Sequence, residues 1–264
     1  MLDIPTGVIT DTYPVTGTSS VHVRTGSVTA GHVAWVAPAS STTVVVGTRA
    51  TGDVAGTRIA DVVARDRSGV LWLYQGAGAW GRGAFLGRVR VGGGWQAYDR
   101  LAGGSDVTGD GRSDLLATDK SGVLWVYPGT GNAKAPFSAR KRVGGGWGTY
   151  NHVTAVGNIG GAKAGDLVAR DRAGVLWLYL GKGDGSFAER VRIGGGWSGY
   201  GHLVGIGDAN RDGRPDLLAS RGGGETTFYA GTGDWRSPFK TGPGGSVLSW
   251  HSGHDEVFWR AGPT

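Results

Sequence analysis

Two acidic loops carry the side chains best suited to bind a metal ion. Each loop spans nine residues and places oxygen-bearing side chains at positions 1, 3, 5 and 9, with glycine at position 6. These side chains belong to Asp106, Thr108, Asp110 and Asp114 in the first loop and to Asp208, Asn210, Asp212 and Asp216 in the second. Position 7, which is Arg112 or Arg214, can add its backbone carbonyl oxygen. Because calcium takes six to eight oxygen ligands at about 2.3–2.6 Å, the pattern predicts one Ca²⁺ site in each loop.

The loops are not EF-hands, because position 12 holds Ala117 or Ala219 where the bidentate Glu would stand. In the alternative interpretation, each Asp-Gly pair is only a hairpin turn that the aspartates cap. Four oxygen positions in phase, found twice, favour the metal. All ligands come from one loop and no base or nucleophile accompanies them, so the predicted calcium is structural rather than catalytic.

Two further loops keep only their end positions. One begins at Asp53 and ends at Asp61, and the other begins at Asn158 and ends at Asp166. Their central positions hold Ala, Thr or Gly. We therefore expect turn hydrogen bonds, and no metal, in these two loops.

All four loops belong to one internal repeat. The segments DVVARDRSGVLWLY, DLLATDKSGVLWVY and DLVARDRAGVLWLY begin at Asp61, Asp114 and Asp166. The Trp of each LW pair and the Trp of each GGGW element recur in the same register, 50 to 53 residues apart. The repeat runs without a linker or a break in composition, which predicts a single domain over residues 1–264.

Each unit reads as a set of short strands. VLWLY is β-branched and aromatic, Gly-rich turns flank it, and no window shows the 3.6-residue periodicity of a helix. With 53 glycines in 264 residues, long helices would be costly. About 50 residues with roughly four strands is the size of one blade, so the sequence predicts an all-β fold consisting of a single β-propeller.

The apolar stretch before each acidic loop is the candidate innermost strand of a blade. Five such stretches occur, at 43–46, 98–101, 150–156, 200–206 and 246–250. They predict five four-stranded blades. The last blade would be closed by strands from both termini, namely 255–259 with 20–24 and 32–36, although 8–13 competes with 255–259 for one place.

Composition limits the classes of binding partner and the cellular compartments that we expect for the chain. The net charge is +6 and the pI is about 9.7, which admits anionic partners, but there is no run of five basic residues. Arg pairs recur once per repeat, at Arg88 and Arg90 and at Arg190 and Arg192, so we do not expect nucleic-acid binding. The chain has no cysteine, no apolar run of 18 residues and no signal-peptide pattern at its start. It is either intracellular or a mature form without its leader.

The candidate ligand-binding residues are aromatic and recur in register. A Trp after three glycines is followed by a Tyr three residues later and by an Arg or a His two residues after that. The set consists of Trp95, Tyr98, Arg100, Trp147, Tyr150, His152, Trp197, Tyr200 and His202. Such a group can stack on the apolar face of a sugar and hydrogen-bond its hydroxyls, with avidity from repetition. The alternative is a Trp wedged between blades as core, and core is the role expected for Trp72, Trp125 and Trp177.

An enzyme is the third class considered. The chain has no GxSxG, no HExxH and no cysteine nucleophile. His152 and His202 are equivalent in the repeat, which indicates a repeated role rather than one catalytic centre. We therefore expect no catalytic residues and no enzyme activity.

The combination of GDxxxDGRxDLLA, GVLWxYxGxG and RVxxGGGW resembles the FG-GAP/VCBS repeat of integrin-α-like propellers and of many secreted actinobacterial proteins. The resemblance covers about residues 52–233. It implies calcium at the aspartates of the two complete loops, with Thr108 departing from the usual Asp or Asn. It also implies secretion and a role in adhesion or carbohydrate binding, in some members as lectins or as modules attached to enzymes or toxins.

Together these patterns predict a secreted, calcium-stabilised propeller that binds glycans or cell-surface polysaccharide. It would act alone or as the targeting domain or subunit of a larger secreted protein or toxin assembly. A protein-binding scaffold without sugar binding is the main alternative, since fold alone does not determine function.

Overall fold

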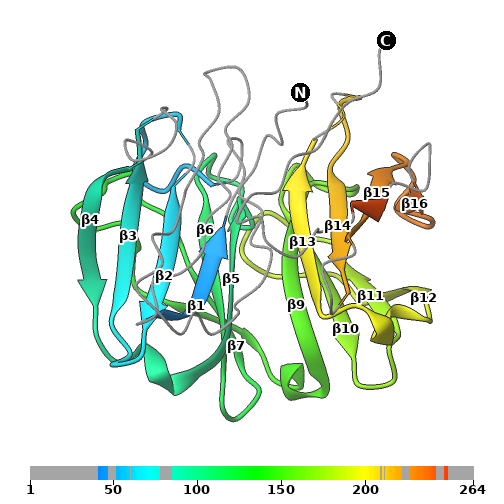
Figure 1. Ribbon diagram of the computed structural model, residues 1–264, viewed down its shortest axis with the longest axis horizontal. Helices are drawn as coiled ribbons and strands as arrows, with labels where there is room; N and C mark the ends of the chain where they lie inside the picture. Colours follow the sequence, from blue (N-terminus) through cyan, green and yellow to red (C-terminus); the bar gives the residue numbers. More distant parts are fainter. Residues whose placement is uncertain are drawn as a thin grey trace.

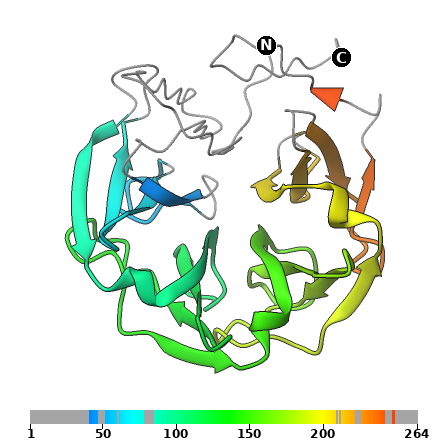
Figure 2. The same cartoon turned by 60° about the horizontal axis from the view of Figure 1, so that its bottom comes forward.

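The computed structural model describes residues 41–46, 52–59, 61–77, 85–208, 210, 212–221, 226–241 and 247–248. These residues form four antiparallel sheets arranged as blades around a common centre (Figures 1 and 2). The innermost strands of neighbouring blades contact each other in turn, β1 with β5, β5 with β9 and β9 with β13. The predicted all-β propeller is thus confirmed.

Each blade is a meander whose strands follow chain order from the centre outward. Blade 1 consists of β1 (Ser41–Val46), β2 (Val62–Asp66), β3 (Leu71–Gly76) and β4 (Phe85–Gly92). Blade 2 consists of β5 (Tyr98–Ser105), β6 (Asp114–Asp119), β7 (Leu124–Tyr127) and β8 (Lys141–Gly144). Blade 3 consists of β9 (Tyr150–Gly157), β10 (Asp166–Asp171), β11 (Leu176–Tyr179) and β12 (Val191–Gly194). Blade 4 consists of β13 (His202–Gly207), β14 (Asp216–Ser220), β15 (Thr226–Gly231) and β16 (Phe239–Thr241).

The number of blades differs from the prediction, because the described residues form four blades and not five. The terminal strands expected at 8–13, 20–24, 32–36 and 255–259 lie outside the described residues. The stretch 246–250 was expected to begin a blade of its own. Instead, β17 (Val247–Leu248) pairs with β15 in blade 4. An apolar run does not reveal which strand it will pair with, so counting such runs gave one blade more than the described residues form.

The blades are joined by buried side chains between their faces. In β3, Leu71 and Leu73 are fully buried, and they pack in one cluster with Leu115 and Ala117 of blade 2. The same kind of cluster joins blades 2 and 3 and blades 3 and 4. Each sheet thus buries its apolar residues against its neighbours, as radial packing requires.

Three short 3₁₀ helices connect one blade to the next, namely η2 (Trp95–Ala97), η3 (Trp147–Thr149) and η4 (Trp197–Gly199). The Trp at the start of each helix is buried and lies against a Tyr of the following blade. The ring centroids of Trp147 and Tyr179, for example, are 4.5 Å apart. The backbone N–H of Trp147 also bonds the carbonyl of Gly122 at 2.9 Å. A Cβ on Gly122 would lie 2.7 Å from the backbone nitrogen of Gly148, so this close approach requires glycine.

A buried aspartate at the start of the second strand ties each blade together. In blade 3, Asp166 accepts N–H bonds from Ile159 at 2.6 Å, from Gly160 at 3.1 Å and from Gly181 at 2.7 Å. Asp61 and Asp114 accept N–H bonds from the equivalent three positions, and Asp216 from two of them. Burial raises the pKa of Asp166 to about 6, although its three N–H donors act in the opposite direction.

Side chains also bridge the innermost strands of blades 3 and 4. His152 Nε2 lies 2.7 Å from the carbonyl oxygen of Leu203, and Thr154 Oγ1 accepts the N–H of Gly205 at 3.3 Å. Desolvation by burial lowers the pKa of His152 to about 4. The imidazole is therefore neutral at physiological pH and serves as a bridge between blades.

No described helix is long and apolar enough to cross a membrane.

Replacing Asp166 by Asn tests the role of the buried aspartate. An amide offers one acceptor oxygen to three N–H donors, so at least one buried donor loses its partner, at a cost of about 1–3 kcal/mol in the free energy of unfolding. Because loop 158–166 holds Gly160 and Ala162 where ligands would stand, urea unfolding should show the same loss with calcium and with chelator. Asp184→Asn, in an exposed loop, is the control and should change stability little. An unchanged Asp166→Asn would contradict the assignment.

Acid should weaken the bridge made by His152. Its folded pKa of about 4 lies below the ordinary value of 6.5, so its contribution to stability is complete above pH 6.5 and is lost as the pH falls through 4. His152→Gln should therefore show a shallower loss of stability than the unmodified protein between pH 6.5 and 4. An NMR titration of the imidazole measures the pKa directly. A value near 6.5 would rule out the buried neutral histidine.

Candidate functional site

The two complete acidic loops lie at equivalent places in their blades. Loop 106–114 connects β5 to β6, and loop 208–216 connects β13 to β14. Each loop therefore joins the innermost strand to the second strand. The repeat places them at the same end of their blades.

In the first loop, the carboxylates accept hydrogen bonds from backbone N–H groups. Asp106 accepts N–H bonds from Asp110 at 3.1 Å and from Gly111 at 2.8 Å. Asp110 accepts the N–H of Arg112 at 3.0 Å, and the guanidinium of Arg112 lies 3.4 Å from its other oxygen. Thr108 Oγ1 lies 3.3 Å from Asp114 Oδ1. Positions 1 and 5 are thus linked through the backbone of the turn, whereas Thr108 at position 3 is linked to position 9.

The second loop has the same frame with a closer pair of side chains. Asp208 accepts N–H bonds from Asp212 at 2.9 Å and from Gly213 at 2.8 Å. The amide of Asn210 donates to Asp212 Oδ2 at 3.1 Å. Arg214 places its guanidinium 4.0 Å from the same carboxylate oxygen. At position 3, the second loop has the amide oxygen of Asn210, whereas the first loop has the hydroxyl of Thr108.

The degenerate loop 53–61 holds its shape through its own hydrogen bonds, as predicted. Asp53 accepts the N–H groups of Gly56, Thr57 and Arg58 at 2.7, 2.9 and 2.5 Å. Arg58 adopts a left-handed conformation with φ 66°. In loop 158–166, Asp166 makes the three bonds described above.

The oxygen donors of the complete loops suit calcium by their chemistry, but the described conformation assigns them other partners. Asp114 and Asp216 are almost fully buried, with exposed fractions of 2% and 0%, and accept N–H bonds from the loop and from the end of the third strand. In the part of the chain that the structure describes, no three His, Asp or Glu side chains gather closely enough to hold a metal ion. The side chains that remain accessible to a cation are those at positions 1, 3 and 5.

The predicted sugar-stacking residues lie inside the protein. Trp95, Trp147 and Trp197 have exposed fractions of only 7%, 5% and 8%. Tyr98, Tyr150 and Tyr200 are buried as well, and each hydroxyl bonds a second Tyr hydroxyl of its blade at 2.5 to 2.7 Å. A ring buried between blades has no free face for a sugar. These six residues therefore belong to the core between blades, which was the alternative role considered for them.

The polar members of that set lie on the innermost strands. Arg100 is on β5, His152 on β9 and His202 on β13. His152 bonds the backbone of blade 4, and one guanidinium nitrogen of Arg100 is buried without a hydrogen-bond partner. The structure thus assigns the polar members to the centre and the aromatic members to the interblade cores.

The second Trp of each repeat, expected in the core, is only partly buried. Trp72, Trp125 and Trp177 each donate their indole N–H to an aspartate six residues earlier, at 2.8 to 2.9 Å. An arginine guanidinium lies over each ring, 4.0 to 4.1 Å from its centroid; the arginines are Arg88, Arg140 and Arg190. Sequence reasoning did not find this Asp–Trp–Arg group, although the constant spacing of Asp and Trp is a signal for it.

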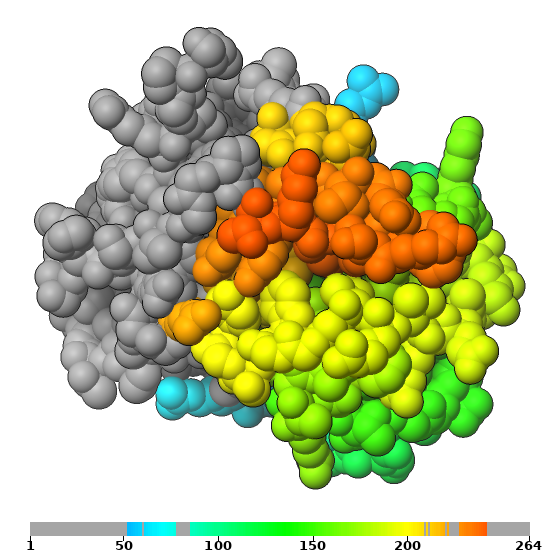
Figure 3. Space-filling model, turned by 90° about the vertical axis from the view of Figure 1, so that its right-hand side faces the viewer, coloured from blue at the N-terminus to red at the C-terminus, as the bar shows by residue number. Residues whose placement is uncertain are grey.

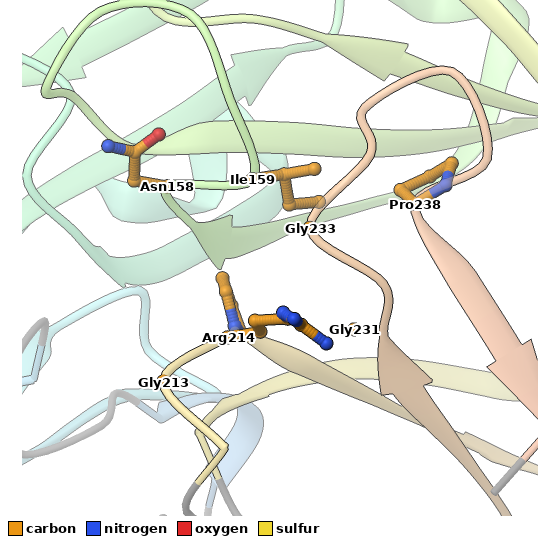
Figure 4. A pocket seen from close by; sticks show the side chains of 8 residues that line it. Asn158, Ile159, Gly213, Arg214, Gly231, Gly233 and Pro238 are labelled. Carbon is orange, nitrogen blue, oxygen red and sulfur yellow. The ribbon is translucent and has the colours of Figure 1, made fainter.

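A groove opens between blades 3 and 4, which lie side by side on the face shown in Figure 3. It has a volume of about 170 Å³ and is lined by Asn158, Ile159, Gly213, Arg214, Pro215, Gly231, Gly233 and Pro238. Figure 4 shows Asn158 and Ile159 on the loop of one blade and Arg214 and Pro238 on the other. The groove thus combines an amide and a guanidinium with apolar side chains.

Trp235 lies beside this groove. It is partly buried, its Cβ would be 3.1 Å from a Cβ on Gly160, and the guanidinium of Arg236 lies 4.3 Å from its ring centroid. In the equivalent loop of blade 2, Ala133 occupies its place, since GTGNAKAPF aligns with GTGDWRSPF. The blade 3–blade 4 boundary therefore carries an aromatic residue that the equivalent boundary between blades 1 and 2 lacks.

Comparisons with known proteins give one family match. Residues 164–219 match the family model for the FG-GAP-like repeat. This segment begins in the loop before β10 and ends in β14, which is one full period of the repeat. A comparison with curated protein sequences finds no match.

Several solved structures are similar in part. One is an Agrocybe aegerita lectin, described as specifically recognising non-reducing terminal N-acetylglucosamine, with 22% identity and a TM-score of 0.46 over 72% of this chain and 49% of that one. Human WBSCR16 has 11% identity and a TM-score of 0.37 over 80% of this chain and 53% of that one. The Photorhabdus luminescens Tc holotoxin pore has 12% identity and a TM-score of 0.32 over 78% of this chain and 12% of that one. The chain spans about half the length of the first two.

The family match and the fourfold recurrence of the matched unit lead to one assignment. The blades on either side of blade 3 repeat its strands and its loop aspartate. Blades 1 and 2 also repeat the Trp of its LW pair, whereas Thr227 stands at that position in blade 4. One period of the chain thus matches the FG-GAP-like repeat, and the described residues form a β-propeller built from successive copies of that unit.

Proposed function

We propose that this propeller is a non-enzymatic recognition module that binds glycans at the groove between blades 3 and 4. The observation that carries the proposal is the composition of the groove, in which Arg214 and Asn158 face Ile159 and two prolines. Ligand sites combine apolar walls with a few polar groups that set orientation. A sugar offers both an apolar ring face and a rim of hydroxyls, so it matches such a surface.

The size of the groove limits what it can take. Its volume of about 170 Å³ is smaller than the roughly 300–1,000 Å³ of pockets that enclose drug-sized ligands. One sugar unit, with the rest of the glycan in solvent, is the ligand that suits this volume. Arg214 can donate several hydrogen bonds to hydroxyls, and Trp235 stands close by as an apolar boundary.

Calcium belongs to the proposal as a stabilising ion. The ligands would be the side-chain oxygens at positions 1, 3 and 5 of the complete loops, with the backbone carbonyl at position 7. Asp114 and Asp216 are left out of this set because they hold the blade together. Calcium bound only by the folded state adds stability according to its concentration and affinity.

We further propose that the protein acts outside the cell, where calcium is near millimolar, alone or as a subunit of a larger assembly. The repeat family and the calcium-type loops support this. A propeller that only binds protein is the competing function, and the experiments below distinguish the two.

Calcium dependence is tested by melting. Two millimolar calcium should raise the free energy of unfolding by roughly 0.6–1.8 kcal/mol per site if the Kd lies between 10⁻⁴ and 10⁻³ M. Asp212→Ala should remove the share of loop 208–216. Asp53→Ala is the matched control, since it should lower the melting temperature with or without calcium and leave the calcium increment intact. A protein whose melting ignores calcium would refute the site.

The groove is tested by a glycan array followed by titration calorimetry with the selected sugar. Arg214→Ala keeps the backbone carbonyl of the loop but removes the guanidinium, and should weaken sugar binding by about tenfold or more, as expected for one good charged hydrogen bond. Lys120→Ala, at the opposite end of its blade, should leave affinity unchanged. A blank array from a folded protein would overturn the glycan proposal and favour the protein-binding scaffold.

A further inference from the structure

The outer strands carry cationic side chains that neither the metal loops nor the groove uses. We define the basic rim as the exposed cations of segments 85–92, 138–144 and 187–194. Its members are Arg88, Arg90, Arg140, Lys141, Arg142, Arg190 and Arg192. The same segments contain one carboxylate, Glu189. The rim therefore holds a marked excess of positive charge on three successive blades.

Strand register places one arginine pair at the same position in each blade. Arg90 is paired across the sheet with Trp72, Arg142 with Trp125 and Arg192 with Trp177. The second arginine of each pair lies two residues earlier: Arg88 is within β4, and Arg140 and Arg190 directly precede β8 and β12. Each blade thus presents two guanidinium groups beside its partly buried Trp.

One guanidinium of each pair is held in a defined position. Arg88, Arg140 and Arg190 stack over their Trp rings at 4.0 to 4.1 Å. Arg190 also donates to the hydroxyl of Tyr150 at 2.7 Å, and Arg140 donates to that of Tyr98. Stacking occupies the flat face of the guanidinium, and most of its five N–H donors stay available at the edge.

Carboxylates of the protein neutralise this rim only in part. The indole N–H of the neighbouring Trp lowers the pKa of Asp66, Asp119 and Asp171, and the positive charge of the stacked arginine lowers it further. Within the described ranges, the recorded ion pairs join Arg112 to Asp110 and Arg214 to Asp212, and none involves a rim residue. The acids nearest to the stacked arginines, Asp66, Asp119 and Asp171, each accept the indole N–H of their Trp and two backbone N–H groups. Their hydrogen-bonding capacity is largely used inside the blade.

Protection of the sheet edge explains charge on an outer strand but not this arrangement. Any lysine would discourage edge-to-edge pairing. Six of the seven rim cations are arginine, in repeated pairs, and three are stacked on Trp. Arginine is the residue that matches planar or tetrahedral oxyanions through two parallel hydrogen bonds.

We propose that the basic rim binds an anionic polysaccharide, one carrying carboxylate or sulfate groups, that lies across successive blades. The inference rests on the proposed glycan-binding function but uses a different surface from the groove. Repetition from blade to blade matches a polymer with repeated charges and gives avidity. Single-stranded nucleic acid is disfavoured because it needs exposed aromatic faces for its bases, and here the guanidinium groups cover the indole rings.

The test measures binding of the full chain to dextran sulfate and to polygalacturonate, with neutral dextran as the negative probe, at 50 and 200 mM NaCl. The rim variant Arg90→Gln/Arg142→Gln/Arg192→Gln removes the unstacked arginine of each pair and leaves the Trp stacking intact. The control variant Lys134→Gln/Lys163→Gln/Lys182→Gln removes three exposed lysines from loops outside the rim. Circular dichroism and melting verify that both variants fold.

The rim variant should bind both polyanions at least tenfold more weakly and show a smaller dependence of affinity on salt, whereas the control variant should change less than twofold. Equal weakening of both variants, or no weakening of the rim variant, would overturn the proposal. Duplex DNA and polyphosphate are measured in the same assay, and tighter binding of either one than of both polysaccharides would overturn the proposal as well. Binding of the neutral sugar at the groove is measured for the unmodified protein, the rim variant and Arg214→Ala. A failure of the rim proposal and a failure of the groove proposal are therefore separate results.

Discussion

The buried carboxylate at the start of the second strand is the interaction on which each blade depends. Asp61, Asp114 and Asp166 each accept three backbone N–H groups, and the donors lie 6, 7 and 15 residues away in sequence. One side chain thus fixes the loop before it and the end of the third strand. Hydrogen bonds to a charged group contribute about 1.5–3 kcal/mol each, and an unmet buried donor costs a similar amount. This loss is large against the 5–15 kcal/mol by which folded domains are stable.

That carboxylate separates two roles within one acidic loop. The aspartate at position 9 is part of the fold in every blade, whether or not the rest of the loop can hold a cation. The side chains at positions 3 and 5 are free to vary, and in loops 53–61 and 158–166 they are replaced while position 1 stays Asp or Asn and the turn is kept. Calcium is therefore proposed as an addition to a loop that already has internal support.

The Trp residues show a similar division between core and surface. The GGGW indole is wedged between blades and packs on a Tyr of the next one, while the LW indole is only partly buried, with Arg above it and Asp at its N–H. The first Trp excludes ligand and joins the blades. The second orients a guanidinium, and the repeat reproduces that orientation on three blades. Among the described residues, the surfaces we propose for recognition are the groove at the blade 3–blade 4 boundary and the basic rim.

Local pattern alone determined the repeat, the strand class, the propeller and the hydrogen-bonded shape of the degenerate loops, because period and turn residues are properties of neighbouring positions. Tertiary structure decided what depends on residues far apart. Leu71 and Trp72 are adjacent in sequence, yet their side chains lie on opposite faces of one strand, and only the neighbouring blade decides which is buried. The apolar run 246–250 looked like a new innermost strand, but pairing with β15 assigned its described part to blade 4. Asp114 looked like a metal ligand, but the N–H of Gly129, 15 residues away, lies within reach of its carboxylate only once the blade has formed.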